Sequence, residues 1–101
     1  MTTLNNIITS IQSNEEMLRN EFVLSHLFVF GSYARNEQTL NSDLDLFYEV
    51  KPGTHMTLGR LKRLENAIKK ITSIKVVELV NKKHANPIVL NHAKESTIQL
   101  F

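Results

Sequence analysis

The apolar positions along the chain follow two periods, one typical of helices and the other of strands. Helical spacing predicts a first helix from about residue 4 to residue 19 or 20 and a second over residues 57–71. Asn86-Pro87 predicts the start of a last helix, which we expect to end near Glu95. Shorter apolar runs predict strands at residues 25–30, 43–50, 74–80 and 97–101.

Helices and strands therefore alternate, and the connection between the first two strands holds only a short polar helical segment. That connection is too short for a regular parallel crossover. We expect an α+β fold, with alternating helices and strands, a small mixed β-sheet and helices packed mainly on one face. A length of 101 residues predicts a single domain over residues 1–101. The run at 74–80 is apolar on both sides, which predicts a central strand.

The predicted strand at residues 43–50 carries the only two aspartates of the protein, Asp43 and Asp45. Residues two apart on a strand point to the same side, about 6.6 Å apart along the chain. The other side of this strand is apolar and should pack under helices. Two carboxylates that face one space repel each other unless a cation lies between them, and Mg²⁺ prefers such oxygen ligands. An Asp-x-Asp pair alone is nevertheless more often part of a solvated edge than of a metal site.

A Gly-Ser pair follows the strand predicted at residues 25–30. Gly31 permits unusual backbone angles, and Ser32 is a good N-cap for the short segment through Ala34 and Glu37. The exposed N–H groups at such a start can bind phosphate. A lone Gly-Ser is usually only a turn. Its combination with the two aspartates on the next strand predicts a site for phosphoryl transfer.

Glu78 interrupts the apolar run at residues 74–80. A carboxylate in such a run is costly to bury without a partner. It is therefore either an exposed strand end or a functional group, namely a third metal ligand or the base that accepts a proton from the attacking hydroxyl. Tyr33, beside the Gly-Ser pair, is interpreted as a packing or nucleotide-contacting residue rather than a nucleophile.

Composition narrows the class of protein. No apolar run approaches the roughly 18 residues of a membrane span, and no signal peptide is visible. The absence of cysteine excludes disulfides and thiolate metal sites and is compatible with a cytoplasmic protein. Basic residues concentrate after Leu58, although the net charge is only +2. This distribution suits a triphosphate or a charged protein partner, is too weak to indicate direct nucleic-acid binding, and leaves the oligomeric state open.

The residues Gly31-Ser32-Tyr33-Ala34-Arg35 and Ser42-Asp43-Leu44-Asp45-Leu46 resemble the signature of the DNA polymerase beta nucleotidyltransferase superfamily, in its minimal (MNT) branch. The family pattern is G-S-x-A-x-G, a spacer, and S-D-x-D followed by an apolar residue. Asn36 stands where the family usually has glycine, but asparagine tolerates positive φ better than most residues. The family's third acidic residue is normally aspartate, and Glu78 matches its position with a side chain one methylene longer.

The resemblance implies a palm-like sheet and an Mg²⁺-dependent nucleotidyltransferase with two ions. Asp43, Asp45 and Glu78 would be the catalytic and metal-binding residues, while Gly31, Ser32, Arg35 and Ser42 would contact the nucleotide phosphates. It also implies that AMP moves from ATP to a tyrosine of a HEPN-domain protein, the toxin partner of a toxin–antitoxin pair. The basic half of the chain is a candidate surface for that partner. Two alternatives remain: a catalytically silent antitoxin that neutralises its partner by binding, because Asn36 and Glu78 depart from the pattern, or a structural Asp-x-Asp without a nucleotide role.

Overall fold

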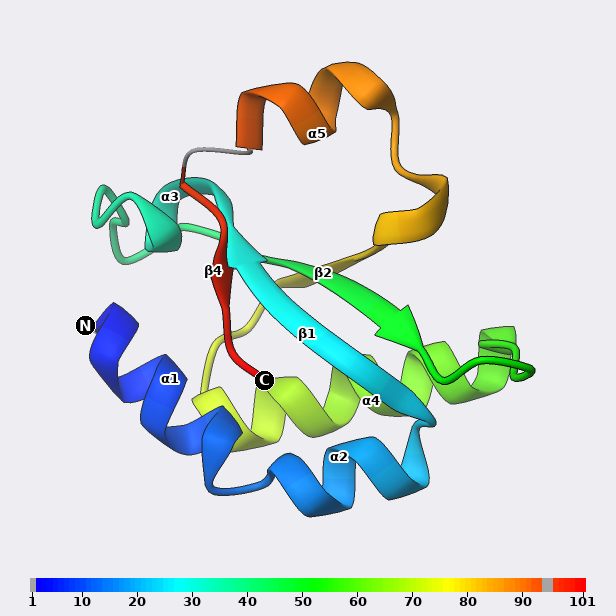
Figure 1. Ribbon diagram of the computed structural model, residues 1–101. Coiled ribbons are helices and arrows are strands. Elements are labelled where there is room, and N and C mark those ends of the chain that lie inside the picture. Colours follow the sequence, from blue (N-terminus) through cyan, green and yellow to red (C-terminus); the bar gives the residue numbers. More distant parts are fainter. Residues whose placement is uncertain (1, 94–95) are drawn as a thin grey trace.

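The computed structural model describes residues 2–93 and 96–101 of the chain. In these residues a four-stranded mixed sheet has the order β3-β2-β1-β4 (Figure 1). The strands are β1 (Leu24–Phe30), β2 (Leu44–Val50), β3 (Val77–Asn81) and β4 (Ile98–Gln99). β1 pairs antiparallel with β2 and β4, whereas β2 and β3 are parallel. The expectation of a small mixed sheet is confirmed.

The helices are α1 (Leu4–Gln12), α2 (Glu15–Glu21), α3 (Gly31–Ala34), α4 (Leu58–Thr72) and α5 (Pro87–Ala93), with a short 3₁₀ segment at Lys82–His84. α1, α2 and α4 lie together on one side of the sheet, and α5 lies over the other side (Figure 1). Helices therefore cover mainly one face, as expected. None of the helices in the described part of the chain is long and apolar enough to cross a membrane.

The first predicted helix is wrong in one respect, because it is two helices separated by Ser13 and Asn14. The Ser13 hydroxyl donates to the Thr9 carbonyl at 2.7 Å, and the side-chain Nδ2 of Asn14 donates to the Ser10 carbonyl at 2.8 Å. Serine and asparagine side chains that bond the backbone in this way compete with the helical hydrogen bonds. The chain turns here, so that α2 can continue toward β1.

The main core lies between the sheet and the three helices on its covered side. Every second residue of β2 is buried there, and the members from the strand are Leu44, Leu46 and Tyr48. The helices contribute fully buried side chains at positions 7, 11, 18, 64 and 68. This confirms that the apolar side of β2 packs under helices, as the alternation of its residues predicted.

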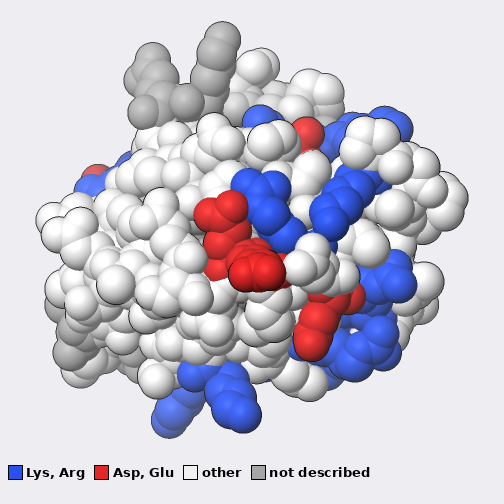
Figure 2. All heavy atoms as spheres, turned by 60° about the horizontal axis from the view of Figure 1, so that its bottom comes forward, with Lys and Arg blue, Asp and Glu red and all other residues white. Residues whose placement is uncertain are grey.

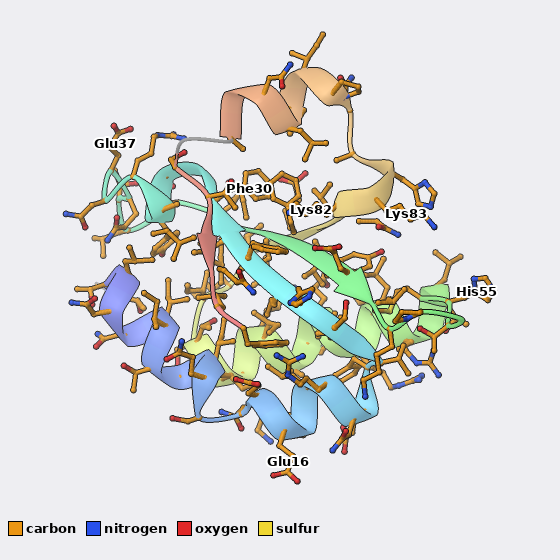
Figure 3. All side chains as sticks on the ribbon, viewed as in Figure 1. Glu16, Phe30, Glu37, His55, Lys82 and Lys83 are labelled. Carbon is orange, nitrogen blue, oxygen red and sulfur yellow. The ribbon has the colours of Figure 1, made fainter. Side chains whose placement is uncertain are left out.

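A smaller apolar cluster lies on the opposite face of the sheet. It consists of Phe28 and Phe47 from the sheet and Ala93 from α5, with Phe30 and Leu90 packed against it. The rings of Phe30 and Phe47 are stacked with their centroids 3.9 Å apart, and Phe30 lies between the sheet and α5 (Figure 3). This cluster holds α5 over the face of the sheet on which Asp45 lies.

The last helix, α5, begins where the sequence predicted. Asn86 caps α5, since its Oδ1 accepts from the Ile88 amide at 2.8 Å. The predicted end of this helix at Glu95 lies outside the described residues.

The expectation that residues 74–80 form a central strand is wrong: β3 begins at Val77 and is an edge strand. Its apolar residues are explained by β2 on one side and by the core beneath it, not by a second neighbouring strand.

Candidate active site

The candidate site lies where β1 ends, α3 begins, and β2 and β3 run side by side. Phe30 pairs with Asp45 across β1 and β2, and Asp45 pairs with Glu78 across β2 and β3. Neighbouring strands are about 4.8 Å apart. The register therefore brings the Gly-Ser turn and two acidic residues from distant parts of the chain into one place.

Gly31 approaches the Asp45 carboxyl group more closely than any other residue type would allow. Its φ is +76°, and a Cβ at this position would overlap Oδ2 of Asp45 and lie 3.2 Å from Cγ. Glycine adopts this backbone conformation readily, and it lacks the Cβ that would collide with the carboxyl group. The prediction that Gly31 adopts unusual backbone angles is thus confirmed. Gly31 lies directly against Asp45, the predicted catalytic carboxylate.

Asp45 and Glu78 form an acidic pair. The pKa of Asp45 is raised to about 6, first by burial, then by the hydrogen bond with Glu78 and the negative charge of Glu78, and least by the charge of Asp43. The positive charge of Arg35 acts in the opposite direction and lowers the pKa of Asp45. Glu78 itself is exposed on the edge strand. The site thus concentrates negative charge that a cation would stabilise.

Asp43 directly precedes β2 and is exposed. It lies near enough to Asp45 to influence that carboxyl group through its charge. In the described residues, no three histidine, aspartate or glutamate side chains converge in an arrangement that could hold a metal ion. The chemistry of the donor set nonetheless fits Mg²⁺, because all three residues offer hard carboxylate oxygens and Asp45 carries unbalanced charge. Asp43, Asp45 and Glu78 are accordingly the residues that would hold such an ion.

The short helix differs in detail from its prediction. α3 begins at Gly31, so Phe30 occupies the cap position without a side-chain hydrogen bond, and Ser32 is not the N-cap. The positive φ of Gly31 turns the chain one residue earlier than expected. α3 ends at Ala34 and not at Glu37. Ser32 accepts a hydrogen bond from the Glu37 amide through its carbonyl at 2.9 Å, which closes the loop after the helix.

Asn36 adopts φ = +59°, the left-handed conformation that the family's usual glycine would allow. The expectation that the turn tolerates asparagine is therefore confirmed for the backbone. Arg35, next to it, forms an ion pair with Glu37 at 3.1 Å and is about half exposed, at 46%. Glu37 points away from the sheet at the far end of the α3 loop (Figure 3). Arg35 is positioned within electrostatic reach of Asp45 but is engaged with Glu37 in this structure.

Ser42 has a local structural role. Its hydroxyl accepts a hydrogen bond from the Thr39 amide at 2.8 Å and so holds the loop before β2. Tyr33 is buried, at 4% exposure, in the main core, and burial raises the pKa of its hydroxyl. The interpretation of Tyr33 as a packing residue is confirmed. The loop held by Ser42 sets the position from which the chain enters Asp43 and β2.

The basic second half does not form a continuous surface on the helix-covered side. On the face that Figure 2 shows, Lys and Arg side chains lie in separate groups around central carboxylates. On α4, Lys62 and Lys69 both pair with Glu65, at 2.8 and 3.3 Å. Exposed pairs of this kind are typical of a solvated helix face. They favour a role for Lys62 and Lys69 on the solvated face of α4 rather than in a basic binding surface.

Two features of the site were not predicted from the sequence. Phe30 contributes an aromatic ring beside the Gly-Ser turn, and α5 contributes Ile88 and Val89, which line a cavity together with Gly31 and Arg35. A run of three apolar residues at 88–90 is more than one helix face needs in order to pack. That excess could have indicated an apolar side left open to solvent.

The model of the family described as "Polymerase beta, Nucleotidyltransferase" matches residues 12–101. The chain belongs to this family. Two curated relatives from Methanocaldococcus jannaschii are named protein adenylyltransferases. One is 30% identical over 98 residues, covering 97% of this chain and 98% of the relative. The other is 32% identical over 103 residues, covering 99% of this chain and 100% of the relative. Both relatives have nearly the same length as this chain.

Solved structures of nucleotidyltransferases have the same fold. A minimal nucleotidyltransferase is 24% identical with a TM-score of 0.75, and the match covers 97% of this chain and 96% of that one. A toxin–antitoxin structure with AMP-PNP is 21% identical with a TM-score of 0.67, covering 97% and 72%. A complex of a tri-AMPylated HEPN toxin with an MNT antitoxin from Shewanella oneidensis is 16% identical with a TM-score of 0.63, covering 93% and 71%. The expected nucleotidyltransferase fold is confirmed.

Proposed function

We propose that this nucleotidyltransferase-family chain is an Mg²⁺-dependent protein adenylyltransferase, and that it moves AMP from ATP to a tyrosine hydroxyl of a HEPN-domain partner. The observation that carries the proposal is the contact between the Gly31 backbone and Asp45, with Glu78 beside Asp45 on the next strand. The Gly-Ser turn and the carboxylate pair thereby lie together. The names of the relatives and the HEPN complex among the structures of the same fold support the choice of nucleotide and partner.

In this reaction, the acceptor oxygen attacks the α-phosphorus of ATP. A new bond forms between that oxygen and phosphorus, the bond to the bridging oxygen of the β-phosphate breaks, and pyrophosphate leaves. When bound, Mg²⁺ would neutralise phosphate charge and stabilise the entering and leaving oxygens. Asp43, Asp45 and Glu78 would hold it, and the backbone at Gly31 and Ser32 would contact the outer phosphates. Arg35 would add positive charge there after leaving Glu37.

Glu78 is suited to accept the proton of the acceptor hydroxyl. It is exposed at the edge of the sheet, where an acceptor can reach it, and its neighbour Asp45 is the more buried member of the pair. Removal of a general base typically costs about 100-fold or more in rate.

The direct test is label transfer from ATP radiolabelled at its α-phosphate, in the presence of Mg²⁺ and a HEPN-domain protein from the same organism. We expect the partner protein to become labelled and the label to be lost in Asp43→Asn, while Glu78→Gln slows transfer at least about 100-fold. Glu49→Gln is a matched control, because Glu49 lies on β2 but outside the site. Transfer that continues unchanged in Asp43→Asn would exclude the mechanism.

A second candidate function is a silent antitoxin that neutralises its partner by binding alone. It is favoured by the absence of a converged set of three metal-binding side chains among the described residues. The same experiment separates the two functions. A stable complex with the HEPN-domain protein and no label under any Mg²⁺ concentration would support the silent antitoxin.

A further inference from the structure

Exposed large apolar side chains are concentrated beside the candidate active site. In the described part of the chain, five such side chains are at least 40% exposed: Leu40 (82%), Leu58 (88%), Val76 (52%), Ile88 (65%) and Val89 (40%). Leu40 and Val76 line one cavity, and Ile88 and Val89 line another. Only Leu58 of this set lies on neither. Single exposed apolar residues are ordinary, but apolar side chains grouped around a cavity mark a binding surface.

The cavity with Leu40 and Val76 has a volume of about 340 Å³. It lies between the loop before β2 and the segment that connects α4 with β3. The amide of Leu44 donates to the carbonyl of Val76 at 2.9 Å, so these two walls are joined by a backbone hydrogen bond. We name this cavity the Leu40–Val76 pocket.

Two residues that line the Leu40–Val76 pocket are close in the chain to the carboxylates. Ser42, which lines it, directly precedes Asp43, and Val76 is two residues before Glu78. Residues two apart on an extended chain are separated by about 6.6 Å. A side chain held in the pocket would therefore bring its neighbours in sequence to the carboxylates.

The second cavity, about 260 Å³ in volume, borders the phosphate turn through Gly31 and Arg35. A transferase must hold two substrates at once, and the contacts of this second cavity associate it with the nucleotide. The lining of the Leu40–Val76 pocket does not include Gly31, but it includes Ser42, which directly precedes Asp43 in the chain. This pocket is therefore the place available to the acceptor.

The charge of the pocket defines the chemistry of its occupant. Lys75 lies between Ile74 and Val76, lines the pocket and forms no ion pair with any residue that the structure describes. The hydroxyls of Ser42 and Ser73 add polar groups, and the pocket lining itself contains no carboxylate. A partner segment with an apolar side chain and a nearby carboxylate would fit this pocket. The apolar side chain would contact Leu40 and Val76, and the carboxylate would pair with Lys75.

We propose that the Leu40–Val76 pocket docks the protein segment that carries the acceptor hydroxyl, through an apolar side chain of that segment and an acidic residue that pairs with Lys75. This inference rests on the proposed function for the identity of the partner. It assigns Leu40, Val76 and Lys75 to recognition of the acceptor and not to chemistry.

The test measures binding and transfer separately, using a HEPN-domain protein from the same organism as the probe. The docking variants are Leu40→Ser combined with Val76→Ser, and Lys75→Glu. Leu58→Ser is the matched control, because Leu58 is equally exposed but lies outside both cavities. Circular dichroism verifies that each variant is folded, and Mg²⁺-dependent ATP binding, followed as a thermal shift, verifies that the nucleotide site is intact.

We expect the double serine variant to bind the partner at least about tenfold more weakly, with unchanged ATP binding and with Leu58→Ser as in the native chain. In the transfer assay the KM for the partner should rise by a similar factor, while kcat stays within about twofold. Lys75→Glu should also weaken binding, and this effect should shrink in high salt. Replacing the matching acidic residue of the partner by lysine should restore binding to Lys75→Glu.

Equal dissociation constants for the double serine variant and Leu58→Ser would overturn the docking proposal. A fall in kcat without a change in partner affinity would also overturn it, because the pocket would then act on chemistry. Failure of the proposed function looks different. The native chain would then transfer no label, while the loss of partner binding in the docking variants would still support the pocket as the interface.

Discussion

The two faces of β2 obey different physical requirements. On one face Leu44, Leu46 and Tyr48 are buried under α1 and α4 within the large core. On the other face Asp45 lies beside Glu78 and Phe47, under the smaller cluster that holds α5. One face of β2 thus stabilises the fold, while the other face retains an unfavourable arrangement of negative charges.

The comparison teaches where the fold accepts an energetic cost. Charge repulsion in the acidic pair is compatible with folding because the covered face supplies hydrophobic stabilisation independently. Active sites commonly concentrate groups with perturbed pKa values in this way. Substitutions of the buried residues on the face under α1 and α4 should therefore destabilise the fold. Removal of a negative charge on the face that carries Asp45 should stabilise it.

The largest effect is expected from the covered face. Leu46→Ala removes a side chain with 0% exposure and leaves a cavity in the main core. We expect a loss of about 3 kcal/mol in the free energy of unfolding. Urea denaturation followed by circular dichroism measures it. A loss below about 1 kcal/mol would show that the covered face is not the main source of stability.

An intermediate effect is expected where the two parts meet, at Gly31. Gly31→Ala should destabilise the protein by about 2 kcal/mol, because the new methyl group meets the Asp45 carboxyl group in a backbone region that disfavours alanine. Gly53→Ala is the matched control: Gly53 has φ = +79° but no atom within 4 Å of an added Cβ. It should cost only about 1 kcal/mol.

The Gly31 effect can be assigned by a double-mutant cycle. In the Asp45→Ala background, the nearest remaining atom of residue 45 is Cβ, at 3.3 Å from the added methyl group. Gly31→Ala should then cost about as much as Gly53→Ala. Additive losses would contradict a direct contact between Gly31 and the Asp45 carboxyl group.

The smallest effect has the opposite sign. Asp45→Asn removes one charge of the acidic pair and should stabilise the metal-free protein by about 1 kcal/mol at pH 7.5, a value that allows for solvent screening of this partly exposed group. The folded-state pKa of Asp45 is raised from 3.8 to about 6. Its unfavourable contribution is therefore absent below about pH 4, grows between pH 4 and 6, and is fully present above that range.

Stability differences between the native chain and Asp45→Asn, measured by denaturation at pH 4, 5, 6 and 7.5, check this prediction. The gain in Asp45→Asn should rise with pH and then level off. A gain that is independent of pH would mean that the charge of Asp45 is already balanced in the folded protein.

The sequence predicted most of the fold where the signal was local. Alternation identified the covered face of β2, Asn86 identified the start of α5, and the Gly-Ser pair identified the turn at Gly31. It misplaced features that depend on competition or on distant neighbours. Side-chain hydrogen bonds at Ser13 and Asn14 ended the first helix early, and the position of β3 at the sheet edge followed from strand order, which no periodicity records.

By itself, the sequence determined the chemistry of the site: which residues are acidic, which turn requires glycine, and which family signature they form. Only the tertiary structure decided that Glu78 lies beside Asp45, through the parallel register of β2 and β3. It also decided that Leu40 and Val76 line one pocket although they are far apart in the chain. The physical reason is that side-chain periodicity is a property of neighbouring residues, whereas strand pairing is settled by burial of the whole core.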